Sequence, residues 1–242
     1  MTLVIPPPRV LAPAEIEALR ARCARGGAES PIGYDRDPGS PANGPGSRNR
    51  PWLPNSFVAR FESWLTRGWQ IFEWGTGWST LWLARRVGPT GRVYTVEHDP
   101  HWSNTIRAAA AAEGLNNITF FCFEKDAATT HVTDPVGYLC TVHVAAIDSV
   151  GGFDAIIVDG ELRDLCVEES LTYVRKVLVF DNASTSSRGK DLLMETGWHC
   201  RVEQWVPGHP RPDYADTWYW ARPEFEAGYK GLPPSPHEAL AW

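Results

Sequence analysis

A strand, a glycine turn and the start of a helix follow one another at residues 70–80, in the sequence QIFEWGTGWST. The apolar run before the glycines is typical of a buried parallel strand, which does not alternate between apolar and polar side chains. Gly75 and Gly77 stand where the chain must turn sharply or let a ligand approach its backbone. Such a unit places a ligand at the carboxyl end of a parallel sheet. A plain tight turn would use the same glycines, and this alternative stays open.

The dinucleotide-binding fingerprint is incomplete in this stretch. It requires a third glycine three residues after the second, and Thr80 stands there. This argues against a nicotinamide-dependent oxidoreductase, although a sheet of the same kind would serve one. A non-catalytic module that binds a nucleoside is a further alternative.

The composition restricts the partners that we expect. The chain has 242 residues, of which 43% are apolar, enough for one sizeable core. With 23 basic and 29 acidic residues its net charge is −6, which disfavours general binding to nucleic acid or to a membrane surface. No apolar run approaches membrane-spanning length. The five cysteines form no CxxC pair, which indicates free thiols in the cytoplasm rather than a zinc site.

The chain divides into three parts. Residues 1–51 contain a helix at 13–25 and then a Gly/Pro-rich loop, which we expect to be either a lid or disordered. Residues 52–222 form the main domain, and residues 223–242 form a tail. The sequence leaves the oligomeric state open, and a homo-oligomer is compatible with it.

Strands and helices alternate through the main domain. We expect strands before Gly75 and at residues 92–96, 118–123, 153–160, 177–182, 199–206 and 217–222. Helices are expected at 163–174 and 188–196, whereas residues 138–145 fit either a helix or a strand. This alternation predicts an α/β fold, with a doubly wound parallel sheet and helices on both faces.

Four of the expected strands end in an acid, namely Glu73, Glu97, Asp159 and Asp181. In a doubly wound sheet these ends share one edge, where ligands bind. Glu97 lies about twenty residues after the glycine turn, where a carboxylate can accept hydrogen bonds from both hydroxyls of a ribose. A single acid in such a place is also common as a helix cap, so this alternative remains for each of them.

Three of these segments together resemble successive motifs of the class I S-adenosylmethionine-dependent methyltransferases. They are EWGTG at 73–77, VEHD at 96–99 and IIVDG at 156–160. The resemblance covers roughly residues 52–222. It implies a mostly parallel, seven-stranded sheet whose closing strand pair holds one antiparallel strand. The activity that it implies is methyl transfer from S-adenosylmethionine, which we expect to act on an oxygen of a small molecule or a sugar-containing metabolite.

The resemblance also implies roles for individual residues. The glycine turn would pack against the methionine part of the cofactor, the start of the following helix would meet its carboxylate, and Glu97 would bind the ribose. Asp126 falls near the usual adenine contact. The implied cofactor-binding residues are Glu73, Gly75, Thr76, Gly77, Ser79, Thr80, Glu97, His98, Asp126 and Asp159. His98 is also a possible base, although a packing histidine is the plainer interpretation.

Asp159, Asp181 and Asn182 resemble the metal triad of the catechol O-methyltransferase type. Two carboxylates and an amide oxygen suit Mg²⁺, which would lower the pKa of a substrate hydroxyl. That group carries a lysine where Leu162 stands here, with Arg163 beside it. An arginine is a poor base but could hold an anionic substrate, so Asp159 and Arg163 are the candidate catalytic residues. Alternatively, residues 181–182 form only a polar turn, and Asp159 positions substrate without metal.

Overall fold

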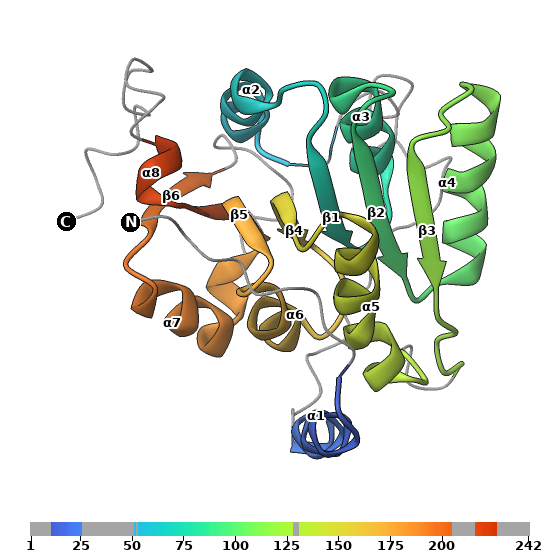
Figure 1. Ribbon diagram of the computed structural model, residues 1–242, viewed down its shortest axis with the longest axis vertical. Helices are drawn as coiled ribbons and strands as arrows, with labels where there is room; N and C mark the ends of the chain where they lie inside the picture. Colours follow the sequence, from blue (N-terminus) through green and yellow to red (C-terminus); the bar gives the residue numbers. More distant parts are fainter. Residues whose placement is uncertain (1–10, 26–50, 52, 128–130, 205–215, 227–242) are drawn as a thin grey trace.

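The computed structural model describes residues 11–25, 51, 53–127, 131–204 and 216–226 (Figure 1). Within them, seven strands form one sheet in the order β3-β2-β1-β4-β5-β7-β6. Only β7 runs antiparallel to its neighbours. The predicted fold class is therefore confirmed. The strands are β1 (Gln70–Trp74), β2 (Arg92–Glu97), β3 (Ile118–Cys122), β4 (Phe153–Val158), β5 (Val174–Asp181), β6 (His199–Gln204) and β7 (Asp216–Ala221).

Helices cover both faces of the sheet (Figure 1). Their bounds are α1 (Pro13–Arg25), α2 (Asn55–Trp64), α3 (Trp78–Val87), α4 (Pro100–Ala112), α5 (Pro135–Asp148), α6 (Arg163–Ser170), α7 (Ser187–Glu195) and α8 (Pro223–Glu226). A short 3₁₀ turn, η3 (Ala183–Thr185), follows β5. Among the described helices, none has the length and apolar character that crossing a membrane requires.

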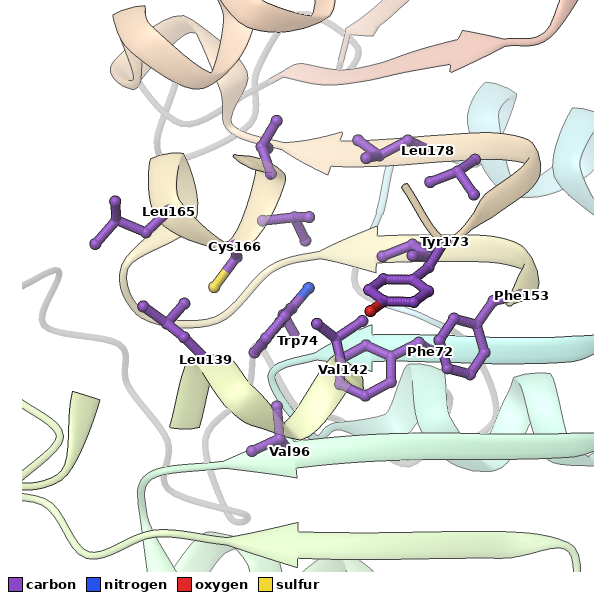
Figure 2. Close-up of a cluster of buried hydrophobic side chains, with 14 of the residues drawn as sticks. Phe72, Trp74, Val96, Leu139, Val142, Phe153, Leu165, Cys166, Tyr173 and Leu178 are labelled. Atoms are coloured by element: carbon purple, nitrogen blue, oxygen red, sulfur yellow. The ribbon is translucent and has the colours of Figure 1, made fainter. Parts of the chain in front are cut away.

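The sheet divides the hydrophobic core into two parts, because successive side chains of a strand point to opposite faces of the sheet. Phe72 and Trp74 of β1 lie on the face covered by α5, α6 and α7, and Figure 2 shows them among Leu139, Val142 and Cys166. Ile71 of β1 lies on the other face, which α2 and α3 cover. Burial on both faces explains why residues 155–158 of β4 and 177–180 of β5 are apolar without alternation.

The structure resolves one ambiguity that the sequence left open and corrects one predicted helix boundary. Residues 135–148 form a helix, which resolves the ambiguity at 138–145. The helix predicted at 163–174 is wrong in its last residues, because α6 ends at Ser170 and β5 begins at Val174. Pairing of Val174 with Phe153 of β4 explains this early start.

The N-terminal helix α1 packs against the face formed by α5 and α6. Leu19 is buried in that core, and Arg22 forms ion pairs with Glu168 and Glu169 of α6. The expected lid falls on residues 26–50, which lie outside the described residues. All five cysteines are free thiols, of which Cys166 is buried, Cys122 is exposed and the other three are half-buried.

Candidate functional site

The acid-tipped strand ends lie at one level along one edge of the sheet. The pairings that set this level are Trp74 with Val96, Trp74 with Val158, and Val158 with Phe180. The next residue of each strand is Gly75, Glu97, Asp159 or Asp181. Chain crossovers from β1 to β2 and from β3 to β4 leave β1 and β4 adjacent, which makes this edge a topological switch point.

The glycine turn passes directly over the end of β4. Gly75 has φ +94°, and a Cβ added there would lie 2.7 Å from the carbonyl oxygen of Asp159. The backbone N–H of Gly75 donates to the carbonyl of Val96 at 2.9 Å. Both the conformation and the space therefore require glycine at this position.

Thr80 fills the position where the dinucleotide fingerprint has its third glycine. Its hydroxyl accepts a hydrogen bond from the backbone N–H of Gly77 at 2.9 Å and donates one to Glu73. The side chain is fully buried. This hydroxyl ties the start of α3 to the end of β1, a contact that glycine could not make.

Glu73 is a buried acid beneath the turn. It is 1% exposed, and it accepts hydrogen bonds from Ser79 Oγ at 2.5 Å and from Thr80. Burial raises the pKa of Glu73 to about 8, although both hydroxyls oppose this shift. In this arrangement Ser79 and Thr80 bind Glu73, and a role toward a cofactor carboxylate stays a prediction.

The raised pKa of Glu73 predicts a pH-dependent stability. Folded Glu73 holds its proton up to a pKa of about 8, compared with an ordinary value of 4.5, so the folded state binds more protons between these values. Its contribution to the free energy of unfolding therefore falls as pH rises through this window, by at most about 1.4 kcal/mol per pH unit. Glu73→Gln should remove this part of the slope in urea unfolding. An identical slope in both proteins would contradict the assignment.

Glu97 links the end of β2 to the glycine turn. One carboxylate oxygen accepts from the backbone N–H groups of His98 at 2.8 Å and Asp99 at 2.9 Å. The other accepts from the N–H of Thr76 at 3.1 Å. These three hydrogen bonds fix both carboxylate oxygens of Glu97 beside the glycine turn.

The neighbours of Glu97 extend this network toward β3 and β4. The ring of buried His98 lies 2.9 Å from Glu97 and 3.6 Å from Glu161, and Glu161 also contacts His131 at 3.2 Å. Asp126 is exposed, and its backbone N–H donates to the carbonyl of His131 at 2.7 Å. Asp126 follows β3, where the resemblance implies the adenine contact, and that role stays a prediction.

Arg163 connects the ends of β4 and β5. The guanidinium donates to Asp159 Oδ1 at 3.1 Å, to the carbonyl of Gly160 at 3.0 Å and to the carbonyl of Asp181 at 2.5 Å. The Arg163 side chain is 3% exposed, whereas that of Asp159 is 34% exposed. Asp159 is therefore the member of this pair that solvent, or an acceptor molecule, can reach.

Asp181 is buried beside this pair. Its oxygens accept from Thr217 Oγ1 at 2.5 Å and from the Asn182 amide nitrogen at 2.7 Å. Burial, followed by the nearby Asp159 carboxylate, raises the pKa of Asp181 well above its ordinary value. The predicted metal triad thus lies together, but it does not fit Mg²⁺ in this arrangement, because Asn182 and Thr217 bind both side-chain oxygens of Asp181 and Arg163 binds one oxygen of Asp159. No group of three or more His, Cys, Asp or Glu side chains within the described ranges could hold a metal ion.

Comparisons with known proteins place the fold. No family model matches the chain. A methyltransferase-like protein from Silicibacter pomeroyi is 19% identical, with 80% of this chain and 95% of that chain covered, at a TM-score of 0.50. The O-methyltransferase TomG of Streptomyces achromogenes, solved with S-adenosylmethionine, is 21% identical over 69% of this chain and 77% of its own, at 0.51. This chain has the class I methyltransferase fold.

One curated relative is similar in sequence to a part of this chain. The protein-L-isoaspartate O-methyltransferase of Ignicoccus hospitalis is 40% identical over 57 residues, which are 23% of this chain. The match spans about a quarter of that relative, 27% of its length.

Sequence reasoning missed two parts of the site in this methyltransferase fold. The Trp102 indole donates to the carbonyl of Thr76 at 2.6 Å, and its ring packs edge-on against Trp78 at 5.9 Å. Glu161 contacts both His98 and His131. The signal for Trp102 was its place in the first turn of the helix after the end of β2. Nothing in the sequence pattern distinguished Glu161 from an ordinary loop acid.

Proposed function

We propose that this protein is an S-adenosylmethionine-dependent methyltransferase that acts on an oxygen of a small molecule or a sugar-containing metabolite. The observation that carries the proposal is the common level of the glycine turn, Glu97 and Asp159 at the switch point between β1 and β4. The net charge of −6 supports a small-molecule acceptor over nucleic acid. The free cysteines support a place in the cytoplasm.

The residues at this edge fit the cofactor. The missing Cβ of Gly75 lets the glycine turn pack against the backbone of Asp159, which holds the turn next to the end of β4. Glu97 supplies a carboxylate at the end of the neighbouring strand for the ribose hydroxyls. When bound, S-adenosylmethionine would supply a methyl group on a cationic sulfonium. The protein contributes mainly alignment of the acceptor and exclusion of water.

Asp159 is the residue that we assign to the acceptor. Its side chain is the exposed member of the Asp159–Arg163 pair. We propose that Asp159 accepts a hydrogen bond from the acceptor hydroxyl and would take up its proton when bound S-adenosylmethionine supplies the methyl group and leaves as S-adenosylhomocysteine. Arg163 then acts as a positioning residue, because its guanidinium fixes Asp159 Oδ1. Coordination of Mg²⁺ is not part of this proposal.

A transfer assay tests the proposed function. Labelled S-adenosylmethionine is incubated with a panel of small hydroxyl compounds, and oxygen-methylated products are identified by mass spectrometry. Asp159→Asn should lower turnover about a hundredfold or more, as expected for loss of a general base. Asp154→Asn at the opposite end of β4 is the matched control. Equal turnover in wild type and Asp159→Asn would remove Asp159 from the chemistry.

A further inference from the structure

The guanidinium of Arg163 lies between the ends of β4 and β5, beside the predicted metal triad. Its three nitrogens donate to three oxygens from the ends of β4 and β5, belonging to Asp159, Gly160 and Asp181. The side chain is almost completely buried. A guanidinium stays protonated in proteins, so this edge holds a permanent positive charge supplied by the chain itself.

The backbone next to Arg163 and Asp181 adopts left-handed conformations. Leu162, the residue before α6, is left-handed with φ 53° and ψ 38°, and Asn182 after β5 is left-handed with φ 54° and ψ 39°. Val150 is the one other non-glycine residue with positive φ in the part of the chain that the structure describes. Such conformations cost free energy and persist where the surroundings enforce them, often at functional sites. Two of the three flank the Arg163 cluster.

The carboxylate of Asp181 also faces protein donors. The Asn182 amide nitrogen points to one oxygen of Asp181, and the Thr217 hydroxyl points to the other. A hard divalent cation would need those oxygens as ligands. It would also have to displace the buried Arg163 guanidinium from Asp159 Oδ1, whereas the other two guanidinium hydrogen bonds go to the backbone carbonyls of Gly160 and Asp181.

We propose that Arg163 is the built-in cation of this edge, in place of a divalent metal. It neutralises the Asp159 carboxylate and fixes its orientation toward the acceptor, so the site functions without Mg²⁺. The role of Arg163 in catalysis rests on the proposed function, methyl transfer. Its test is metal binding alone, with neither cofactor nor acceptor present, so failure of the proposed function would leave the result of this test unchanged.

Paramagnetic resonance and calorimetry with Mn²⁺ alone provide the test. Wild type should show no saturable binding below about 1 mM, the weak limit for oxygen-ligand sites in proteins. In Arg163→Ala the carboxylates lose their cation, so Mn²⁺ should bind and raise the melting temperature. Arg163→Lys keeps a cation and should not respond. Arg188→Ala, which removes an exposed arginine paired with Glu168, is the matched control and should behave as wild type.

Two results would overturn the proposal. One is saturable Mn²⁺ binding to wild type that Asp159→Asn abolishes. The other is a folded Arg163→Ala protein that gains no Mn²⁺ binding, because the guanidinium would then not stand in for a metal. The titrations of wild type and Asp159→Asn do not depend on Arg163→Ala, so they test the proposal even where Arg163→Ala does not fold.

Discussion

Gly75→Ala is expected to abolish binding of S-adenosylhomocysteine and to lower the free energy of unfolding by about 1–3 kcal/mol, the usual cost of overpacking. The added methyl group would lie 2.7 Å from the carbonyl oxygen and 2.9 Å from the carbonyl carbon of Asp159. Both are backbone atoms that cannot rotate away, so the turn or the end of β4 must move. Urea unfolding and calorimetry with S-adenosylhomocysteine measure the two effects.

Gly114→Ala separates this collision from backbone strain. Gly114 also has positive φ, at +68°, but a Cβ there would meet no atom within 4 Å. Its substitution should cost only the strain of a left-handed alanine and leave cofactor binding unchanged. Equal losses of stability and affinity in the Gly75→Ala and Gly114→Ala proteins would show that the close approach to β4 has no special role.

Glu97→Gln is expected to weaken S-adenosylhomocysteine binding by about 1–3 kcal/mol, which corresponds to roughly 5- to 150-fold in Kd. The amide keeps the size of the side chain but loses the charge that would strengthen hydrogen bonds from ribose hydroxyls. It also offers one acceptor oxygen instead of two to the N–H groups of Thr76, His98 and Asp99. Calorimetry should therefore be combined with urea unfolding.

Asp154→Asn is the matched control for this substitution. Asp154 is also a strand carboxylate that accepts a backbone hydrogen bond, from Gln70 at 2.8 Å, and it pairs with Lys176 at 2.9 Å. It lies at the start of β4, the end of the sheet away from the glycine turn. This variant should lose stability but keep its affinity for S-adenosylhomocysteine. If Glu97→Gln does the same, the ribose assignment is wrong.

The strands were predictable because a buried strand in a parallel sheet has a recognisable composition. Residues 155–158 and 177–180 are apolar throughout, since both sheet faces are covered. The region around 138–145 was ambiguous because α5 has apolar residues on all sides, including exposed Val144 and Ile147. The boundary between α6 and β5 depends on pairing of Val174 with Phe153, a contact between segments distant in sequence.

The site was predictable at the level of strand ends and not at the level of side-chain partners. The rule that parallel strands end at a shared edge placed Glu73, Glu97 and Asp159 correctly relative to the sheet. The rule says nothing of which donor meets which acceptor. Arg163 was expected to hold a substrate, and the structure binds its guanidinium to Asp159 and to two carbonyl groups. Such partners depend on loop geometry, including the left-handed Leu162.

Titration of the wild-type protein tests most directly whether the sheet edge binds the cofactor of a methyltransferase. Purified protein is titrated calorimetrically with S-adenosylhomocysteine and, in parallel, with NADH. We expect saturable 1:1 binding of S-adenosylhomocysteine, because the edge offers a glycine turn and the Glu97 carboxylate for the ribose. We expect no binding of NADH, because buried Thr80 stands in place of the third glycine of the dinucleotide fingerprint. Binding of NADH without binding of S-adenosylhomocysteine would contradict the proposed function.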